Sequence, residues 1–270
     1  MISDIPKKKH GRNSVHYSHL IGNEWEPASL DDPKLLDRLL SAAKRAQLPL
    51  RDKLIVLIAC KYGACIRDIL GLTIGDWRAC GCRLEIRIQR QASRGEGVGI
   101  LRLSPGTQSL LHAYIHVERK ECDPEHRELS QLAETDPLFL TAEGCAYGYR
   151  AFVPQWETLC QEAGISLPLH GLRHWFVMRM LRKIEERTHD PGEQQGYKVA
   201  LIKYMGWQSP KTLRAYEIEY HAEKDFRVFE EFSDELLAKD SLPLNEQRPA
   251  MERREEGSFW QNYWHTAGDQ

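Results

Sequence analysis

The segment HGLRH (residues 170–174) and the segment YMGWQSPKTLRAY (residues 204–216) decide how the rest of this chain is interpreted. In the first, His170 and Arg173 lie three positions apart, so on a helix they share one face. In the second, a Gly-Trp pair precedes a tyrosine, and Tyr216 follows Trp207 by nine residues. Arginine binds phosphate through paired donors, and a tyrosine hydroxyl is a possible nucleophile. These segments therefore indicate chemistry on a phosphate.

The composition is that of a globular protein with one large domain or two small ones. Of the 270 residues, 41% are hydrophobic and 28% are charged. No run approaches the ~18 consecutive apolar residues of a membrane span. The lysine-rich first twelve residues are followed by no apolar segment, which excludes a secretory signal. Seven irregularly spaced cysteines then favour a reducing cytoplasm, and we expect no membrane partner.

The net charge of −2 is unevenly distributed along the chain. Six of the 37 basic and fourteen of the 39 acidic residues follow Tyr216, so residues 1–216 carry +6 and residues 217–270 carry −8. A basic body with an acidic tail is compatible with phosphate binding, because the local field attracts a polyanion. Residues 1–28 lack periodicity and read as a basic tail, either a phosphate-contacting arm or a solvated end.

Apolar residues recur at helical spacing in several segments. Four leucines between residues 35 and 40 predict an amphipathic helix that begins near residue 29. Further helices are predicted over the segments 51–61, 65–70, 110–121 and 149–163. Gly164 is placed to end the last of these.

Two short segments alternate apolar and polar residues instead. LEIRI (residues 84–88) and ILRL (residues 100–103) flank a glycine-rich turn, which predicts a β-hairpin with one buried face. The apolar run at residues 137–140 predicts a short strand. We therefore expect an α+β fold that is mostly α, with a small antiparallel sheet.

The last third of the chain combines a polar connection with an acidic tail. The polar stretch between Arg182 and Val199 reads as a surface insertion. In the tail, apolar residues at helical spacing predict an amphipathic helix: Phe226, Phe229, Phe232 and Leu236. We thus expect a basic tail (1–28), a principal domain (29–220) and an acidic C-terminal helix and tail (221–270).

The two opening segments resemble the second conserved box of the tyrosine recombinases, the phage-integrase family of DNA breaking and rejoining enzymes. GACIRDILGLTIGD (residues 63–76) resembles the first box, and the resemblance spans about residues 29–220. It implies the recombinase catalytic fold and site-specific recombination of a mobile genetic element. Strand cleavage would pass through a 3′-phosphotyrosyl intermediate without metal or cofactor. The implied partners are duplex DNA and a tetrameric synapse of copies or related recombinases, at the cytoplasmic nucleoid.

The resemblance also implies a role for each matching residue. Tyr216 would be the nucleophile, and Arg173 would clamp the negatively charged phosphate. His170 would manage the tyrosyl proton or donate to a phosphate oxygen. The indole N–H of Trp207 would donate one hydrogen bond, and Asp68 occupies the family's acidic position. Contacts to DNA are expected from Arg94, His174, Lys211 and Arg214.

Two positions depart from the family pattern. Cys65 replaces the first arginine and has no charge to clamp phosphate, while Arg67 should face elsewhere because two residues on a helix are about 200° apart. Arg94 stands where the family has a lysine that protonates the leaving oxygen, and arginine gives up a proton poorly. The alternative function is therefore a catalytically impaired relative that acts as a DNA-binding or regulatory subunit.

Other interpretations stay open. His170 and His174 have a metal-ligand spacing, but Gly171 occupies the place of a zincin's glutamate. A second interpretation of residues 200–216 is a helix-turn-helix reader of a general DNA-binding regulator, although Gly206 lies late for that turn. The phenylalanines of the tail would pack on their own domain or, by resemblance, on a neighbouring subunit. The family's N-terminal DNA-clamping domain has no counterpart here, so we expect a fragment or a reduced clamp.

Overall fold

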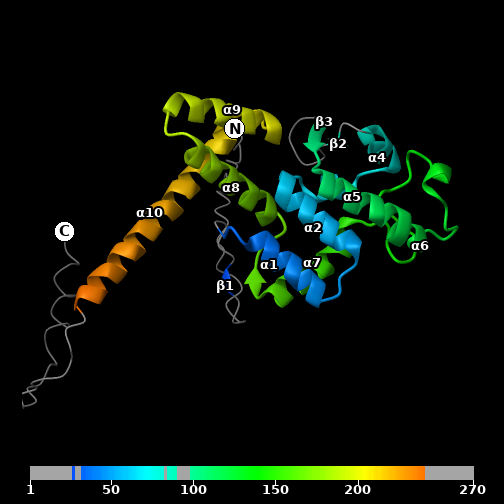
Figure 1. Cartoon of the computed structure of the whole chain (residues 1–270), viewed down its shortest axis with the longest axis horizontal. Helices are drawn as coiled ribbons and strands as arrows, with labels where there is room; N and C mark the ends of the chain where they lie inside the picture. The colour runs from blue at the N-terminus through cyan, green and yellow to red at the C-terminus, as the bar shows by residue number, and fades with distance from the viewer. Residues whose placement is uncertain (1–25, 28–31, 82–83, 90–97, 241–270) are drawn as a thin grey trace, which may run out of the picture. The chain divides into compact units, whose positions relative to one another are not determined.

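The computed structural model describes residues 26–27, 32–81, 84–89 and 98–240 (Figure 1). The basic cluster near the N-terminus and the hairpin turn with Arg94 lie outside these residues. The chain divides into two compact units, Met1–Tyr220 and His221–Gln270. The first unit contains the helical domain.

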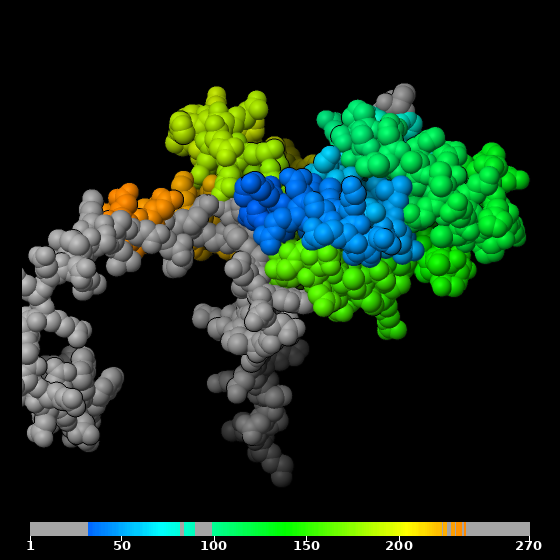
Figure 2. All heavy atoms as spheres, turned by 60° about the horizontal axis from the view of Figure 1, so that its bottom comes forward, coloured from blue at the N-terminus to red at the C-terminus, as the bar shows by residue number. Residues whose placement is uncertain are grey.

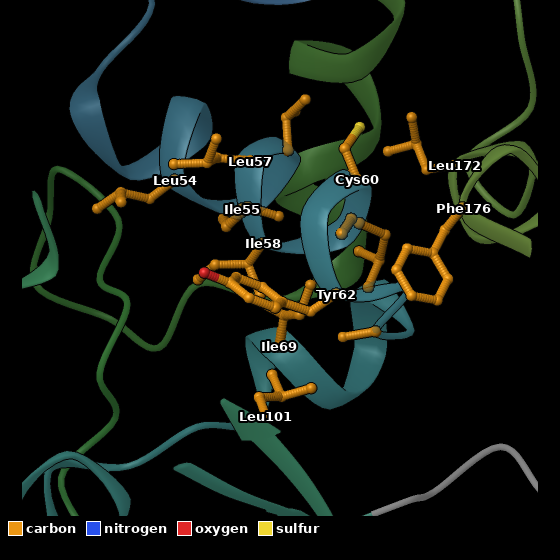
Figure 3. Close-up of a cluster of buried hydrophobic side chains, with 14 of the residues drawn as sticks. Leu54, Ile55, Leu57, Ile58, Cys60, Tyr62, Ile69, Leu101, Leu172 and Phe176 are labelled. Carbon is orange, nitrogen blue, oxygen red and sulfur yellow. The ribbon is translucent and has the colours of Figure 1, made fainter. Parts of the chain in front are cut away.

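Helix α2 (Leu50–Tyr62) is the centre of the helical domain. It packs against α1 (Leu35–Arg45) and α8 (Gly171–Arg187), and α1 lies against α7 (Tyr149–Ala163), as Figure 2 shows. Residues 54–60 of α2 are all buried, so this helix is apolar on every side. Around it gather side chains from other elements, including Leu101, Leu172 and Phe176 (Figure 3).

The predicted hairpin is confirmed. Strand β2 (Glu85–Gln89) pairs antiparallel with β3 (Val98–Arg102), with Arg87 opposite Ile100. Ile86, Ile88 and Leu101 are buried, as the alternating pattern indicated. A second pairing joins β1 (Glu26–Pro27) in parallel to β4 (Ile165–Ser166).

Between residues 70 and 140 the structure adds one helix and lacks one predicted strand. After α3 (Ile66–Leu70) the chain forms another helix, α4 (Ile74–Cys80), which we did not predict. It starts with a capping box, in which Thr73 and Asp76 bind each other's backbone N–H. The expected strand at residues 137–140 makes only isolated bridges, Thr73 to Pro137 and Leu140 to Ala146.

The helix predicted at 110–121 begins earlier and changes pitch. It comprises α5 (Pro105–Tyr114), a π-helical turn η2 (Ile115–Arg119) and α6 (Lys120–Cys122). Ser104 caps its first turn, and Pro105 suits that position because its missing N–H would be unpaired there. A short 3₁₀ turn, η3 (Leu129–Gln131), follows.

A buried ion network lies beyond this helix. Arg119 and Asp123 are each 1% exposed, and Arg119 donates to the carbonyl oxygen of Pro137 at 2.9 Å. Arg127 donates to Asp123 at 2.8 Å and to Asp136 at 3.3 Å. The network therefore ties the end of the helix to the loop that follows it.

The surface insertion expected between Arg182 and Val199 is instead helical. Its first part completes α8, and its second part opens α9 (Pro191–Met205). Asp190 caps α9 by accepting a hydrogen bond from the Glu193 N–H at 2.9 Å. The segment is polar because these helix ends face solvent. Helix α10 (Pro210–Asp240) then crosses the boundary of the two units, so the predicted C-terminal helix begins well before residue 221.

Candidate active site

Tyr216 lies on the second turn of α10 and contacts two aromatic rings. Its ring stacks on Trp207, with centroids 5.3 Å apart and planes 20° apart. His174 meets it edge-on, with centroids 4.4 Å apart. Gly206 explains why Trp207 can be so close: its φ of 67° ends α9 in a left-handed turn. A short connection then leads to Pro210, so the second-box tryptophan and tyrosine lie together.

Arg173 joins the two boxes. Its Nη1 donates to the carbonyl oxygen of Gly63 at 2.7 Å, and its Nη2 donates to that of Met205 at 3.1 Å. Both acceptors belong to helix ends, where carbonyls lack partners within the helix. The guanidinium carbon lies 6.0 Å from the ring centroid of Trp207. Arg173 therefore stands beside the aromatic group while it bonds the ends of α2 and α9.

Three polar links hold the start of α10 against the domain. Oε2 of Glu219 lies 3.0 Å from Nε2 of His174 on α8. Lys198 of α9 pairs with Glu217 at 2.8 Å. The Tyr220 hydroxyl donates to Glu185 of α8 at 2.9 Å, and burial raises the pKa of Tyr220 to about 12. The helix that carries Tyr216 is thus bound to both preceding helices.

His174 is half-buried, and opposing effects act on its charge. Burial lowers the pKa of the imidazole, since a low-dielectric environment disfavours the cation. The negative charge of Glu219 raises the pKa of His174, whereas the nearby His170 lowers it further. In the neutral ring, the bond to Glu219 places the proton on Nε2.

The first box contributes no arginine to this group. Cys65 is half-buried at the start of α3, and Asp68 is buried within it. Arg67 lies over the ring of Tyr149 at 4.9 Å. Arg179, another possible replacement, donates to the carbonyl oxygen of Pro33 at 2.8 Å. Arg67 and Arg179 are thus engaged with Tyr149 and Pro33.

The remaining predicted residues lie around the group. His170 is exposed at the N-terminal end of α8. Lys211 and Arg214 are exposed on the first turns of α10. Arg94 lies outside the described residues. The structure thus brings together Arg173, His174, Trp207 and Tyr216.

We did not anticipate Glu219. It follows Tyr216 by three residues, so a helix drawn from Pro210 would have placed both side chains on one face. Within the described part of the chain, no three His, Cys, Asp or Glu residues are grouped so as to hold a metal ion. The same residues include no helix with the length and apolar character to cross a membrane.

The fold is similar to those of solved DNA recombinases. The XerH site-specific recombinase bound to palindromic difH substrate superposes with a TM-score of 0.55 and 22% identity, over 76% of this chain and 54% of XerH. The Tn1549 transposon integrase in complex with circular intermediate DNA superposes with a TM-score of 0.51 and 18% identity. This match covers 71% of this chain and 62% of the integrase chain in that structure. At such identities the likeness concerns the fold. The chain spans little more than half the length of XerH.

Residues 32–222 match the model of the Phage integrase family. The chain therefore belongs to that family, as the two boxes indicated. A search of curated protein sequences finds no significant match.

Proposed function

We propose that this chain is a tyrosine recombinase catalytic domain that cuts and rejoins duplex DNA in the cytoplasm during the movement of a genetic element. The observation that carries the proposal is the contact of Tyr216 with Trp207 and His174, beside Arg173. Family membership supports it. So do the similar structures of XerH bound to difH substrate and of the Tn1549 integrase in complex with DNA.

The proposed reaction needs no metal. The Tyr216 oxygen attacks the scissile phosphorus and loses its proton to a base, for which the exposed His170 is the candidate. The bond between phosphorus and the 5′ oxygen breaks, and that oxygen takes up a proton. Arg173 would bind the developing negative charge. Attack by a 5′ hydroxyl on the phosphotyrosine reverses these changes and rejoins the strand, in a synapse of copies or related recombinases.

A second candidate function is DNA binding without cleavage. Cys65 supplies no charge, and Arg67 and Arg179 are engaged elsewhere. Arg173 already donates to two carbonyl oxygens, so one of these bonds would have to yield to phosphate. A chain with this site would still bind DNA through exposed cations such as Lys211 and Arg214.

Covalent trapping distinguishes the two functions. Nicked suicide duplexes from the ends of the DNA element that encodes the chain are incubated with it and resolved on a denaturing gel. We expect a protein–DNA adduct that Tyr216→Phe abolishes. Binding to these duplexes without an adduct, together with an adduct from Cys65→Arg, would instead establish the non-catalytic function.

A modified duplex tests the leaving-group step separately. A bridging 5′-phosphorothiolate leaves as a thiolate, which needs no proton at neutral pH because thiols are far more acidic than alcohols. If the arginine at position 94 donates a proton poorly, the thiolate duplex should form adduct faster than the natural one. Equal rates would show that proton donation does not limit cleavage.

A further inference from the structure

The helix that carries Tyr216 also carries a carboxylate that contacts one of its ring partners. Glu219 lies one turn beyond Tyr216 on α10, and its Oε2 is 3.0 Å from Nε2 of His174. His174 in turn touches the ring of Tyr216, with 4.4 Å between centroids. His174 thus links the carboxylate of Glu219 to the ring of Tyr216.

The bond between His174 and Glu219 is partly shielded from water. The side chains of His174 and Glu219 are 20% and 38% exposed, so water competes only in part for their bond. A hydrogen bond to an ionised acceptor is about twice as strong as a neutral one. His174 belongs to α8, whose neighbouring residues Trp175 and Phe176 are buried in the core. The carboxylate therefore attaches α10 to a rigid element.

Tyrosine attack depends on such attachment. In-line displacement requires the hydroxyl oxygen within a few tenths of an ångström of its productive place, and small misplacements are costly. Trp207 supports one contact of the ring by stacking, but it lies in the short connection between α9 and α10. The contact with His174, in contrast, comes from a residue within the 17-residue helix α8.

We propose that Glu219 is a positioning residue that holds Tyr216 for attack by fixing the ring of His174. This role rests on the proposed function of Tyr216 as nucleophile. Glu219 itself would touch neither the DNA nor the reacting atoms. Its counterpart on the same helix, Glu217, pairs with Lys198 at 2.8 Å and provides a matched control.

The position of Tyr216 can be measured without DNA. With 3-fluorotyrosine at position 216 of the full chain, the ¹⁹F resonance should differ from that of the urea-unfolded protein, because the rings of Trp207 and His174 shift it. We expect Glu219→Ala to move this resonance at least halfway to the unfolded value. Glu219→Gln keeps an acceptor oxygen and should stay near the wild type, as should Glu217→Ala.

Two controls separate positioning from folding. His174→Phe keeps a ring but breaks the bond, so it should move the resonance as Glu219→Ala does, and the double variant should add nothing further. If circular dichroism shows that Glu219→Ala loses helical structure, His174→Phe serves as the test variant in its place. An unmoved resonance in both variants, or an equal movement in Glu217→Ala, would overturn the proposal.

Adduct formation provides the second readout. On the suicide duplex, Glu219→Ala should slow the reaction between about tenfold and a hundredfold, whereas Glu219→Gln should restore the wild-type rate. A wild-type chain that forms no adduct would contradict the proposed function alone, because the fluorine resonance would still decide whether Glu219 positions Tyr216.

Discussion

Nη1 of Arg173 lies 2.7 Å from the carbonyl oxygen of Gly63, two residues before Cys65. Arg173 is thereby bonded to the segment that resembles the family's first box. A second bond, from Nη2 to Met205, reaches the residue before the Gly-Trp pair. One side chain thus connects α8 to the ends of α2 and α9, and it has a structural role in addition to any role on phosphate.

Removal of this side chain should destabilise the fold. Arg173→Ala leaves two carbonyl oxygens of buried residues without their donor, and we expect the free energy of unfolding to fall by about 3 kcal/mol. Arg173→Lys should lose less, since an ammonium keeps the charge but not the planar fork. Urea denaturation measures both. Lys203→Ala, an exposed control on α9, should stay within about 0.5 kcal/mol of wild type. Equal midpoints for Arg173→Ala and wild type would refute the structural role.

Gly63 should tolerate no side chain. Its φ is 62°, and an added Cβ would lie 2.3 Å from Cδ1 of Phe176, whose ring is buried. Gly164 has a similar φ of 64° but nothing within 4 Å of such a Cβ. We expect Gly164→Ala to cost about 1 kcal/mol of unfolding free energy and Gly63→Ala about 3 kcal/mol. Thermal or urea unfolding compares the two, and similar losses would mean that Phe176 yields easily.

The buried ion network should make the free energy of unfolding depend on pH in the acidic range. The hydrogen bond from Arg127 lowers the pKa of Asp123, and nearby Arg119 adds to this effect. The stability from the ionised carboxylate is therefore present above its unfolded pKa of about 4. It is lost as the pH falls through the lower pKa of the folded state.

Asp123→Asn tests this dependence. At pH 7 we expect a loss of about 3 kcal/mol, because Arg119 stays buried without its charged partner. The difference between variant and wild type should shrink in urea titrations near pH 3. A constant difference across this range would show that the charge of Asp123 contributes little.

The cap of α9 can be tested by a single substitution. Asp190→Ala removes the acceptor for the Glu193 N–H and should cost about 1 kcal/mol. Amide hydrogen exchange should quicken in the first turn of α9. Asp190→Asn retains an acceptor oxygen and should behave like the wild type. If the amide exchange rates of residues 191–194 are the same in Asp190→Ala and Asp190→Asn, the first turn of α9 does not depend on this cap.

Local patterns in the sequence determined most of the secondary structure and the identity of the family. Apolar spacing located the principal helices, and alternation located the hairpin, because both depend on which face of an element is buried. The patterns failed where the signal was not periodic. Helix α4 has seven residues and depends on its capping box, and the polar ends of α8 and α9 carry few apolar residues.

The order of the box residues likewise indicated Arg173, Trp207 and Tyr216 as a group, and the structure brings them together. Their partners were decided by tertiary structure alone. The carbonyl acceptors of Arg173 lie 110 and 32 positions away in the sequence. Glu219 reaches His174 only because the first turns of α10 lie beside α8. Residue order specifies which groups a chain possesses. Which of them meet depends on how buried helix faces fit together, since packing sets distances that no local spacing encodes.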